Sequence, residues 1–137
     1  MKVDVGGSLE WTGNGLVFRG GAEGSPAVVT DGNAREAASP VQLLLISLVA
    51  CTAADIVDIL GKSRVALGGL RIRMEAERAP EPPRRFTAIR LVYETTGLTE
   101  ADRAKLQRAV DLSHEKYCSV LHTLRSDIDF RTEVVLG

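Results

Sequence analysis

The sequence has almost no net charge, no recognisable secretory leader and no apolar run of membrane-spanning length. It carries 17 Lys and Arg against 18 Asp and Glu, a formal net charge of −1, so we expect no basic surface for nucleic acid. Residues 1–7 lack the apolar core of a signal peptide, which favours a cytoplasmic location. The longest apolar run, residues 43–54, is shorter than the roughly 20 residues that span a bilayer. We therefore expect a buried helix there and no membrane partner.

Cysteine is scarce, which excludes a disulfide-stapled framework. There are two in 137 residues, and in a reducing compartment two cysteines seldom form a permanent bridge. Reversible redox chemistry or metal binding are the remaining chemical uses. Hydrophobic residues make up 45% and charged residues 26% of the chain, as in globular proteins. We predict a single domain over residues 1–137.

The N-terminal third predicts short strands joined by tight turns. Residues 2–38 contain apolar strand formers interrupted by Thr12-Gly13-Asn14-Gly15 and Asp31-Gly32, two glycine-containing sequences typical of hairpin turns. The next segment, Ser39-Pro40-Val41-Gln42, combines a helix N-cap, a proline at the first helical position and a glutamine that can close a capping box. A helix is predicted from there to about Leu60, with Gly61 as the residue that ends it.

The C-terminal half predicts two strands, helical turns and a last strand. Apolar and charged residues alternate over 70–77, and a second strand follows at 86–95 after a proline-rich connection, which predicts a long hairpin. An amphipathic helix is expected from about 99 to 116, continued or restarted after a kink over 117–124, with a strand over 127–136. The order βββ-α-ββ-α(α)-β favours an α+β fold.

Cys51 lies about three turns into the predicted central helix, where the helix dipole gives a thiolate little support. A reactive Cys51 would need a cation from another element, most naturally an arginine. Periodicity alone favours a packed core cysteine, since free cysteines are among the most buried residues. The helix is apolar on all sides in its first three turns, more than a small monomer readily covers, which favours a homodimer.

Cys118 follows a segment with two potentially cationic side chains, His114 and Lys116. It could meet Cys51 if the two helices pack together, a point that sequence separation cannot decide. On one continuous helix, His114, Cys118 and His122 would share one stripe, but the two histidines would lie roughly 12 Å apart, too far to bind one ion. Only Cys118 and one histidine could bind a common ion, and Cys51 would then have to supply a third ligand, so we expect no metal. The glycine-rich segments lack the spacing of phosphate-binding loops, and no hydrolase signature is present.

Two cysteine-containing motifs carry a family resemblance. The first is Ser39-Pro40-Val41-Gln42-Leu43-Leu44 followed by Leu48-Val49-Ala50-Cys51-Thr52-Ala53-Ala54-Asp55-Ile56-Val57. The second is His114-Glu115-Lys116-Tyr117-Cys118-Ser119-Val120. They resemble the central-helix motif and the second-cysteine motif of the OsmC/Ohr family of hydroperoxide reductases. The element order extends the resemblance over essentially the whole chain.

The resemblance implies an intertwined homodimer whose central helices are enclosed by sheets from both subunits. It implies that Cys51 attacks a hydroperoxide and becomes a sulfenic acid, that Cys118 resolves it to a disulfide, and that a thiol or dithiol reduces the disulfide. Neither a cofactor nor a metal is implied. The expected partners are a hydroperoxide, the thiol reductant and a second copy of the chain.

The sequence departs from the Ohr-type pattern around the thiolate. Such members carry a glutamate after the motif proline, where this chain has Val41, and an arginine in the first N-terminal turn, where this chain has Thr12-Gly13-Asn14-Gly15. Arg19 and Arg35 are the substitute candidates for stabilising the thiolate. The missing glutamate also supports an alternative: a protein of the same fold with little peroxidase activity that binds a small apolar ligand or a metal at the dimer interface.

Overall fold

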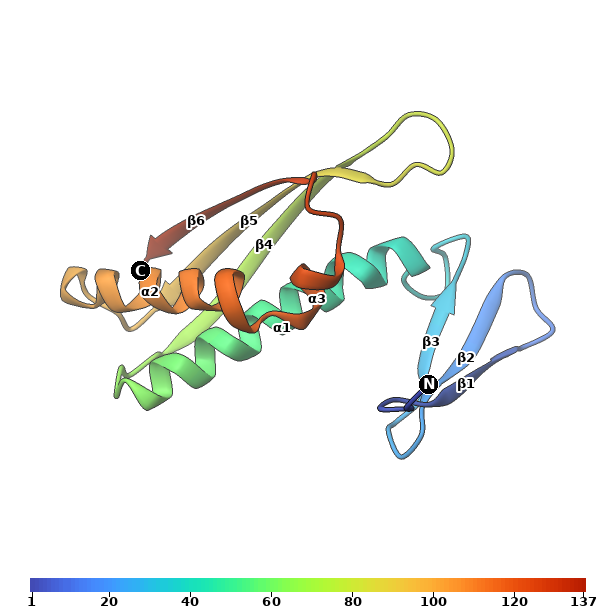
Figure 1. The fold of residues 1–137 in the computed structure, drawn as a ribbon, viewed down its shortest axis with the longest axis horizontal. Coiled ribbons are helices and arrows are strands. Elements are labelled where there is room, and N and C mark those ends of the chain that lie inside the picture. The colour runs from blue at the N-terminus through green and yellow to red at the C-terminus, as the bar shows by residue number, and fades with distance from the viewer. The chain divides into compact units, whose positions relative to one another are not determined.

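The protein contains two three-stranded sheets and a long helix, in the order expected for the α+β fold. A computed structural model describes all residues 1–137, and Figure 1 shows the elements. Contacts divide the chain into two compact units, Met1–Ile46 and Ser47–Gly137, and each is described by itself. A single domain over residues 1–137 therefore stays a prediction.

The first unit is an antiparallel meander of three strands, as predicted. The strands are β1 (Gly7–Trp11), β2 (Val17–Ala22) and β3 (Val28–Asp31), with β2 in the middle. Gly13 and Gly15 have φ values of 85° and 50° in the first turn, which confirms the turn predicted there. The second hairpin turns at Gly24, whose φ is 77°.

The prediction of a hairpin turn at Asp31-Gly32 was wrong. Asp31 ends β3, and its carboxylate accepts backbone N–H bonds from Asn33 at 2.8 Å, Arg35 at 3.1 Å and Glu36 at 3.0 Å. The bonds from Glu36 and Asn33 hold the pKa of Asp31 below its ordinary value. The Asp31 side chain thus closes the loop that leads from β3 toward the helix, because it accepts backbone N–H groups of the loop that have no strand partner.

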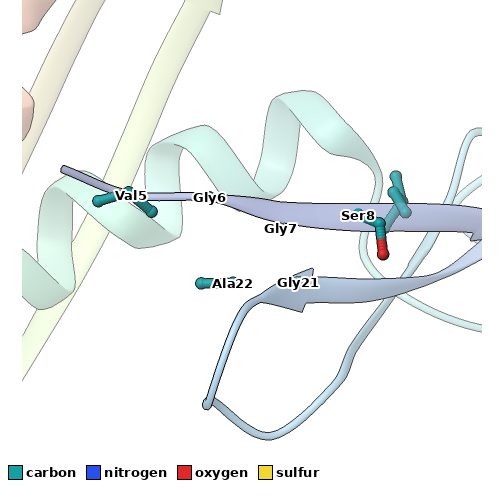
Figure 2. A pocket seen from close by; sticks show the side chains of 7 residues that line it. Val5, Gly6, Gly7, Ser8, Gly21 and Ala22 are labelled. Atoms are coloured by element: carbon teal, nitrogen blue, oxygen red, sulfur yellow. The ribbon is translucent and has the colours of Figure 1, made fainter. Parts of the chain in front are cut away.

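Glycines of β1 and β2 face the backbone of the neighbouring strand, and an open depression forms at one end of this pair (Figure 2). A Cβ atom at Gly7 would come within 2.1 Å of the Gly21 carbonyl oxygen, and one at Gly20 within 2.1 Å of the Ser8 oxygen. Only glycine fits there. The depression, about 400 Å³, is lined by Val5, Gly6, Gly7, Ser8, Leu9, Gly21 and Ala22. It contains no ionisable side chain, so we assign it no chemistry.

The long helix α1 (Pro40–Lys62) begins with the predicted capping box. The Gln42 N–H donates to Ser39 Oγ at 3.2 Å, and the Ser39 N–H donates to Gln42 Oε1 at 2.9 Å. The predicted end was two residues early, because Gly61 lies inside the helix. Lys62 instead pairs with Asp58 at 2.9 Å, and the chain leaves the helix through Arg64, whose φ is 58°.

α1 is the one helix whose length and composition would suffice to cross a membrane, although the apolar run within it is short. Leu48, Thr52, Ile56 and Leu60 recur along one side of it and are fully buried. The core helix of a globular protein meets the same length and composition criteria, and this buried stripe is what a core helix requires.

The second unit places its helices on one face of a mixed sheet (Figure 1). β4 (Gly69–Arg78) and β5 (Phe86–Thr96) form the predicted antiparallel hairpin, while β6 (Asp129–Leu136) pairs with β5 in parallel. The parallel pairing was not predicted; it is possible because the helices between β5 and β6 form a crossover. The core contains Ile89, Leu91 and Tyr93 of β5 with Leu106, Ala109 and Val110.

The connection from β5 to β6 contains the second predicted helix, but in pieces. It begins with a 3₁₀ turn (Glu100–Asp102) and continues as α2 (Arg103–Leu112), a wide π-helical turn (Ser113–Tyr117) and the short helix α3 (Ser119–Thr123). Cys118 separates the last two, with an extended backbone at φ −73° and ψ 98°. The helix therefore restarts after a kink, one of the two outcomes expected from the sequence.

Candidate active site

The two cysteines come together in the second unit. Cys51 lies in α1, next to the buried side chain of Thr52, and is itself partly exposed. Cys118 is fully buried at the start of α3. Both thiols are free. The chain therefore presents one accessible thiol and one protected thiol.

Cys118 is held by the backbone on both sides. Its N–H donates to the Ser113 carbonyl oxygen at 2.8 Å, the hydrogen bond that closes the wide turn. Its Sγ accepts the N–H of Leu121 at 3.3 Å, so the sulfur caps α3 as the oxygen of a serine would. These bonds restrict Cys118 to one place in the core.

The environment of Cys118 keeps its thiol protonated. Burial, the largest cause, raises its pKa from an ordinary 9.0 to about 11, and the N–H of Leu121 opposes this. A side-chain hydrogen bond and charge repulsion from Cys51 raise the pKa further, which means that the two sulfur groups are neighbours. The meeting of Cys51 and Cys118, which the sequence could not decide, is thus found in the structure, while their roles remain predictions.

The buried Tyr93 lies near Cys118 and contacts a partly buried histidine. The Tyr93 hydroxyl and His114 Nε2 are 2.8 Å apart, and the Phe130 ring stands edge-on to the His114 ring with centroids 5.0 Å apart. Burial raises the pKa of Tyr93 to about 12, with a smaller increase from the charge of Cys118 and an opposing hydrogen bond from Thr52. Burial lowers the pKa of His114. Both groups are therefore neutral near pH 7.

A second polar contact joins the wide turn to α1. Ser113 Oγ donates to Asp55 Oδ2 at 2.8 Å, and Ser113 is fully buried. Sequence reasoning missed Ser113, Asp55 and Tyr93. The one available signal was Asp55, a carboxylate one turn after Cys51 in an otherwise apolar stretch of helix.

His114, Cys118 and His122 do not share one helical stripe, because the helix breaks at Cys118. His114 faces Tyr93, while His122 Nε2 lies 2.8 Å from the backbone oxygen of His114. Nowhere in the chain do three His, Cys, Asp or Glu side chains gather closely enough to bind a metal ion.

The two candidate arginines lie in the first unit. Arg19 is exposed in β2 opposite Glu10 of β1. Arg35 is exposed in the loop closed by Asp31, to which its N–H donates. Val41 occupies the first turn of α1 and is partly exposed. That either arginine stabilises a thiolate at Cys51, in the second unit, stays a prediction.

The fold and the paired cysteines define the class of protein. A family model described as OsmC-like protein matches residues 31–133, and the chain belongs to this family. Among curated proteins, protein YhfA of Escherichia coli K12 is 38% identical over 122 residues, covering 88% of this chain and 90% of YhfA.

Solved structures agree with this assignment. A hypothetical protein from Aquifex aeolicus superposes with a TM-score of 0.85 at 25% identity, covering 100% of this chain and 98% of that one. The organic hydroperoxide resistance protein OhrB of Bacillus subtilis superposes with a TM-score of 0.64 at 17% identity, covering 97% and 98%. The second likeness shows the shared fold alone.

Proposed function

We propose that this protein is a thiol-dependent peroxidase that reduces organic hydroperoxides, with Cys51 as the peroxidatic and Cys118 as the resolving cysteine. The observation that carries the proposal is the proximity of a partly exposed Cys51 to a fully buried Cys118. A peroxidatic thiol must be reached by its substrate, whereas a resolving thiol must remain intact until its partner is oxidised.

The reaction has two steps within the protein. The thiolate of Cys51 attacks the O–O bond of the hydroperoxide, and this bond breaks. The hydroxyl oxygen joins the sulfur as a sulfenic acid, and the alkoxide takes up the proton that the Cys51 thiol released and leaves as the alcohol. Cys118 then attacks that sulfur, the S–O bond breaks, and hydroxide leaves as water with the Cys118 proton. A thiol or dithiol reductant restores both thiols by exchange.

Cys118 is suited to the second step and unsuited to the first. Its raised pKa and complete burial leave it as an unreactive thiol near pH 7. Its attack requires an electrophilic sulfur next to it, which only an oxidised Cys51 would supply. Arg19 or Arg35 is our proposed source of the positive charge that favours the Cys51 thiolate.

We further propose a cytoplasmic homodimer. Val57 of α1 and Met74 of β4 are 52% and 41% exposed, and an open groove of about 560 Å³ runs between these two elements. Its lining is mostly apolar: Val49, Ala53, Ala54, Val57, Asp58, Leu70 and Ile72. A second copy of the chain would cover this apolar surface, as the family fold implies.

The homodimer predicts a measurable mass. Sedimentation equilibrium at micromolar concentration should give twice the 14.7 kDa of one chain, because the exposed apolar surface favours association. A stable, well-folded monomer under these conditions would contradict the proposed assembly.

The proposed activity is tested by turnover with a defined substrate and reductant. With dihydrolipoamide or dithiothreitol, we expect the protein to consume cumene hydroperoxide, and to do so faster than hydrogen peroxide. OhrB, which has the same fold, is named for organic hydroperoxide resistance, and this favours the organic substrate. Absence of turnover with any thiol would instead favour the alternative, binding of a small apolar ligand or a metal at the dimer interface, which Val41 and the apolar groove support.

A further inference from the structure

The wide turn Ser113–Tyr117 connects the two cysteines through a short chain of bonds. Its first residue, Ser113, accepts the N–H of Cys118 on its carbonyl oxygen at 2.8 Å. The side chain of the same residue donates to Asp55 Oδ2 at 2.8 Å. Asp55 lies one helical turn after Cys51, so it is on the same side of α1. Ser113 is therefore tied by its backbone to one cysteine and by its side chain to the helix carrying the other.

The hydrogen bond between Ser113 and Asp55 carries a desolvation cost, which points to a role beyond filling space. Ser113 is fully buried and Asp55 is only partly exposed, and an apolar pair of the same size would pack there without the cost of removing a carboxylate from water. A hydrogen bond adds what packing lacks, a defined distance and direction. π-helical turns are rare and occur often at functional sites, and this one ends at Cys118.

We propose that the Asp55–Ser113 hydrogen bond positions Cys118 for disulfide formation, by holding the wide turn against α1 beside Cys51. Asp55 and Ser113 are positioning residues, since neither touches the reacting sulfurs. The inference rests on the proposed function in taking an oxidised Cys51 as the partner of Cys118. It concerns the joining of the two sulfurs, in which the S–S bond forms, the S–O bond breaks and water leaves.

The test separates oxidation of Cys51 from closure of the disulfide. Ser113→Ala and Asp55→Leu remove the bond, whereas Asp55→Asn keeps an acceptor oxygen for Ser113. Glu100→Gln is the matched control, because Glu100 is an exposed carboxylate that pairs with Arg103 rather than with the turn. If either single variant folds poorly, the double variant Asp55→Leu/Ser113→Ala replaces it in the test. The double variant removes both hydrogen-bonding partners and so leaves neither of them buried and unpaired.

With one equivalent of cumene hydroperoxide, we expect every variant to form the Cys51 sulfenic acid at the wild-type rate. Disulfide closure, followed by rapid quenching and mass spectrometry, should slow on the order of tenfold or more in Ser113→Ala and Asp55→Leu, because small misplacements of reacting groups cost rate steeply. Asp55→Asn and Glu100→Gln should close at nearly the wild-type rate. Equal closure rates in all variants would overturn the inference.

A second arm needs no peroxide. Equilibration with oxidised and reduced glutathione measures how strongly the folded protein favours the Cys51–Cys118 disulfide, and the variants without the bond should favour it on the order of tenfold less. If the wild type forms the disulfide with glutathione but consumes no hydroperoxide, the proposed function fails while the positioning role stands. A wild type that forms no such disulfide, or variants with unchanged equilibria, would refute the positioning role.

Discussion

Replacement of Cys51 by serine is expected to abolish hydroperoxide consumption. A serine hydroxyl fits the place of the thiol in α1, but it is not ionised near neutral pH and does not cleave an O–O bond. The loss should be complete to the limit of a continuous assay with dithiothreitol and cumene hydroperoxide. Circular dichroism of the same sample should match the wild type, because Cys51 is only partly buried.

Cys118→Ser should keep the first turnover with hydroperoxide, and this difference from Cys51→Ser distinguishes the resolving from the peroxidatic cysteine. Its Cys51 remains able to reduce one equivalent of hydroperoxide rapidly, but without a resolving thiol the sulfenic acid persists and oxidises further. Mass spectrometry should then find sulfinic acid at Cys51 after a few equivalents. If Cys51→Ser retained activity while Cys118→Ser lost the first turnover, the two roles would have been assigned in the wrong order.

Slow alkylation of Cys118 is the second large effect that we expect. Its pKa is raised from 9.0 to about 11, mainly by burial, so the thiolate fraction near pH 7 should be roughly a hundredfold smaller than in the unfolded chain. Iodoacetamide reacts with the thiolate. Peptide mapping should therefore show Cys118 labelled about a hundredfold or more slowly in the folded protein than in urea.

The rate of Cys118 labelling should depend on pH differently in the folded and unfolded chains. Labelling of Cys118 in the folded protein should rise about tenfold per pH unit until pH approaches 11, whereas labelling in urea should level off near pH 9. The labelling rate in urea therefore exceeds the rate in the folded protein by a smaller factor above pH 9. Equal labelling rates at pH 7 in the folded and unfolded chains would contradict the protected state of Cys118.

Features determined by neighbouring residues could be predicted from the sequence. The capping box of Ser39 and Gln42 predicted the start of α1 correctly because both partners lie within one helical turn. The alternating pattern predicted β4 and β5 as a hairpin for a similar reason, since adjacent strands with a short connection pair antiparallel. The OsmC-like resemblance added the two cysteines as a pair.

Features that depend on distant partners could not be predicted. The parallel pairing of β6 with β5 and the bond between Tyr93 and His114 join segments whose proximity only the fold creates.

Two local features were also misjudged. The end of α1 was placed too early because a glycine can continue a helix at a modest cost in stability. Asp31 resembled a hairpin residue because Asp-Gly is typical of hairpin turns, although its backbone partners lie only two to five residues further along the chain.

We propose that Cys51 and Cys118 form one redox pair. Mapping the disulfide in the oxidised protein is the most direct test of this pairing. The reduced wild-type protein should be treated with one equivalent of cumene hydroperoxide, blocked with iodoacetamide, digested without reductant and analysed by mass spectrometry. We expect a Cys51–Cys118 cross-linked peptide within one chain as the main product. Two alkylated thiols after this treatment, or disulfides only between chains, would contradict it.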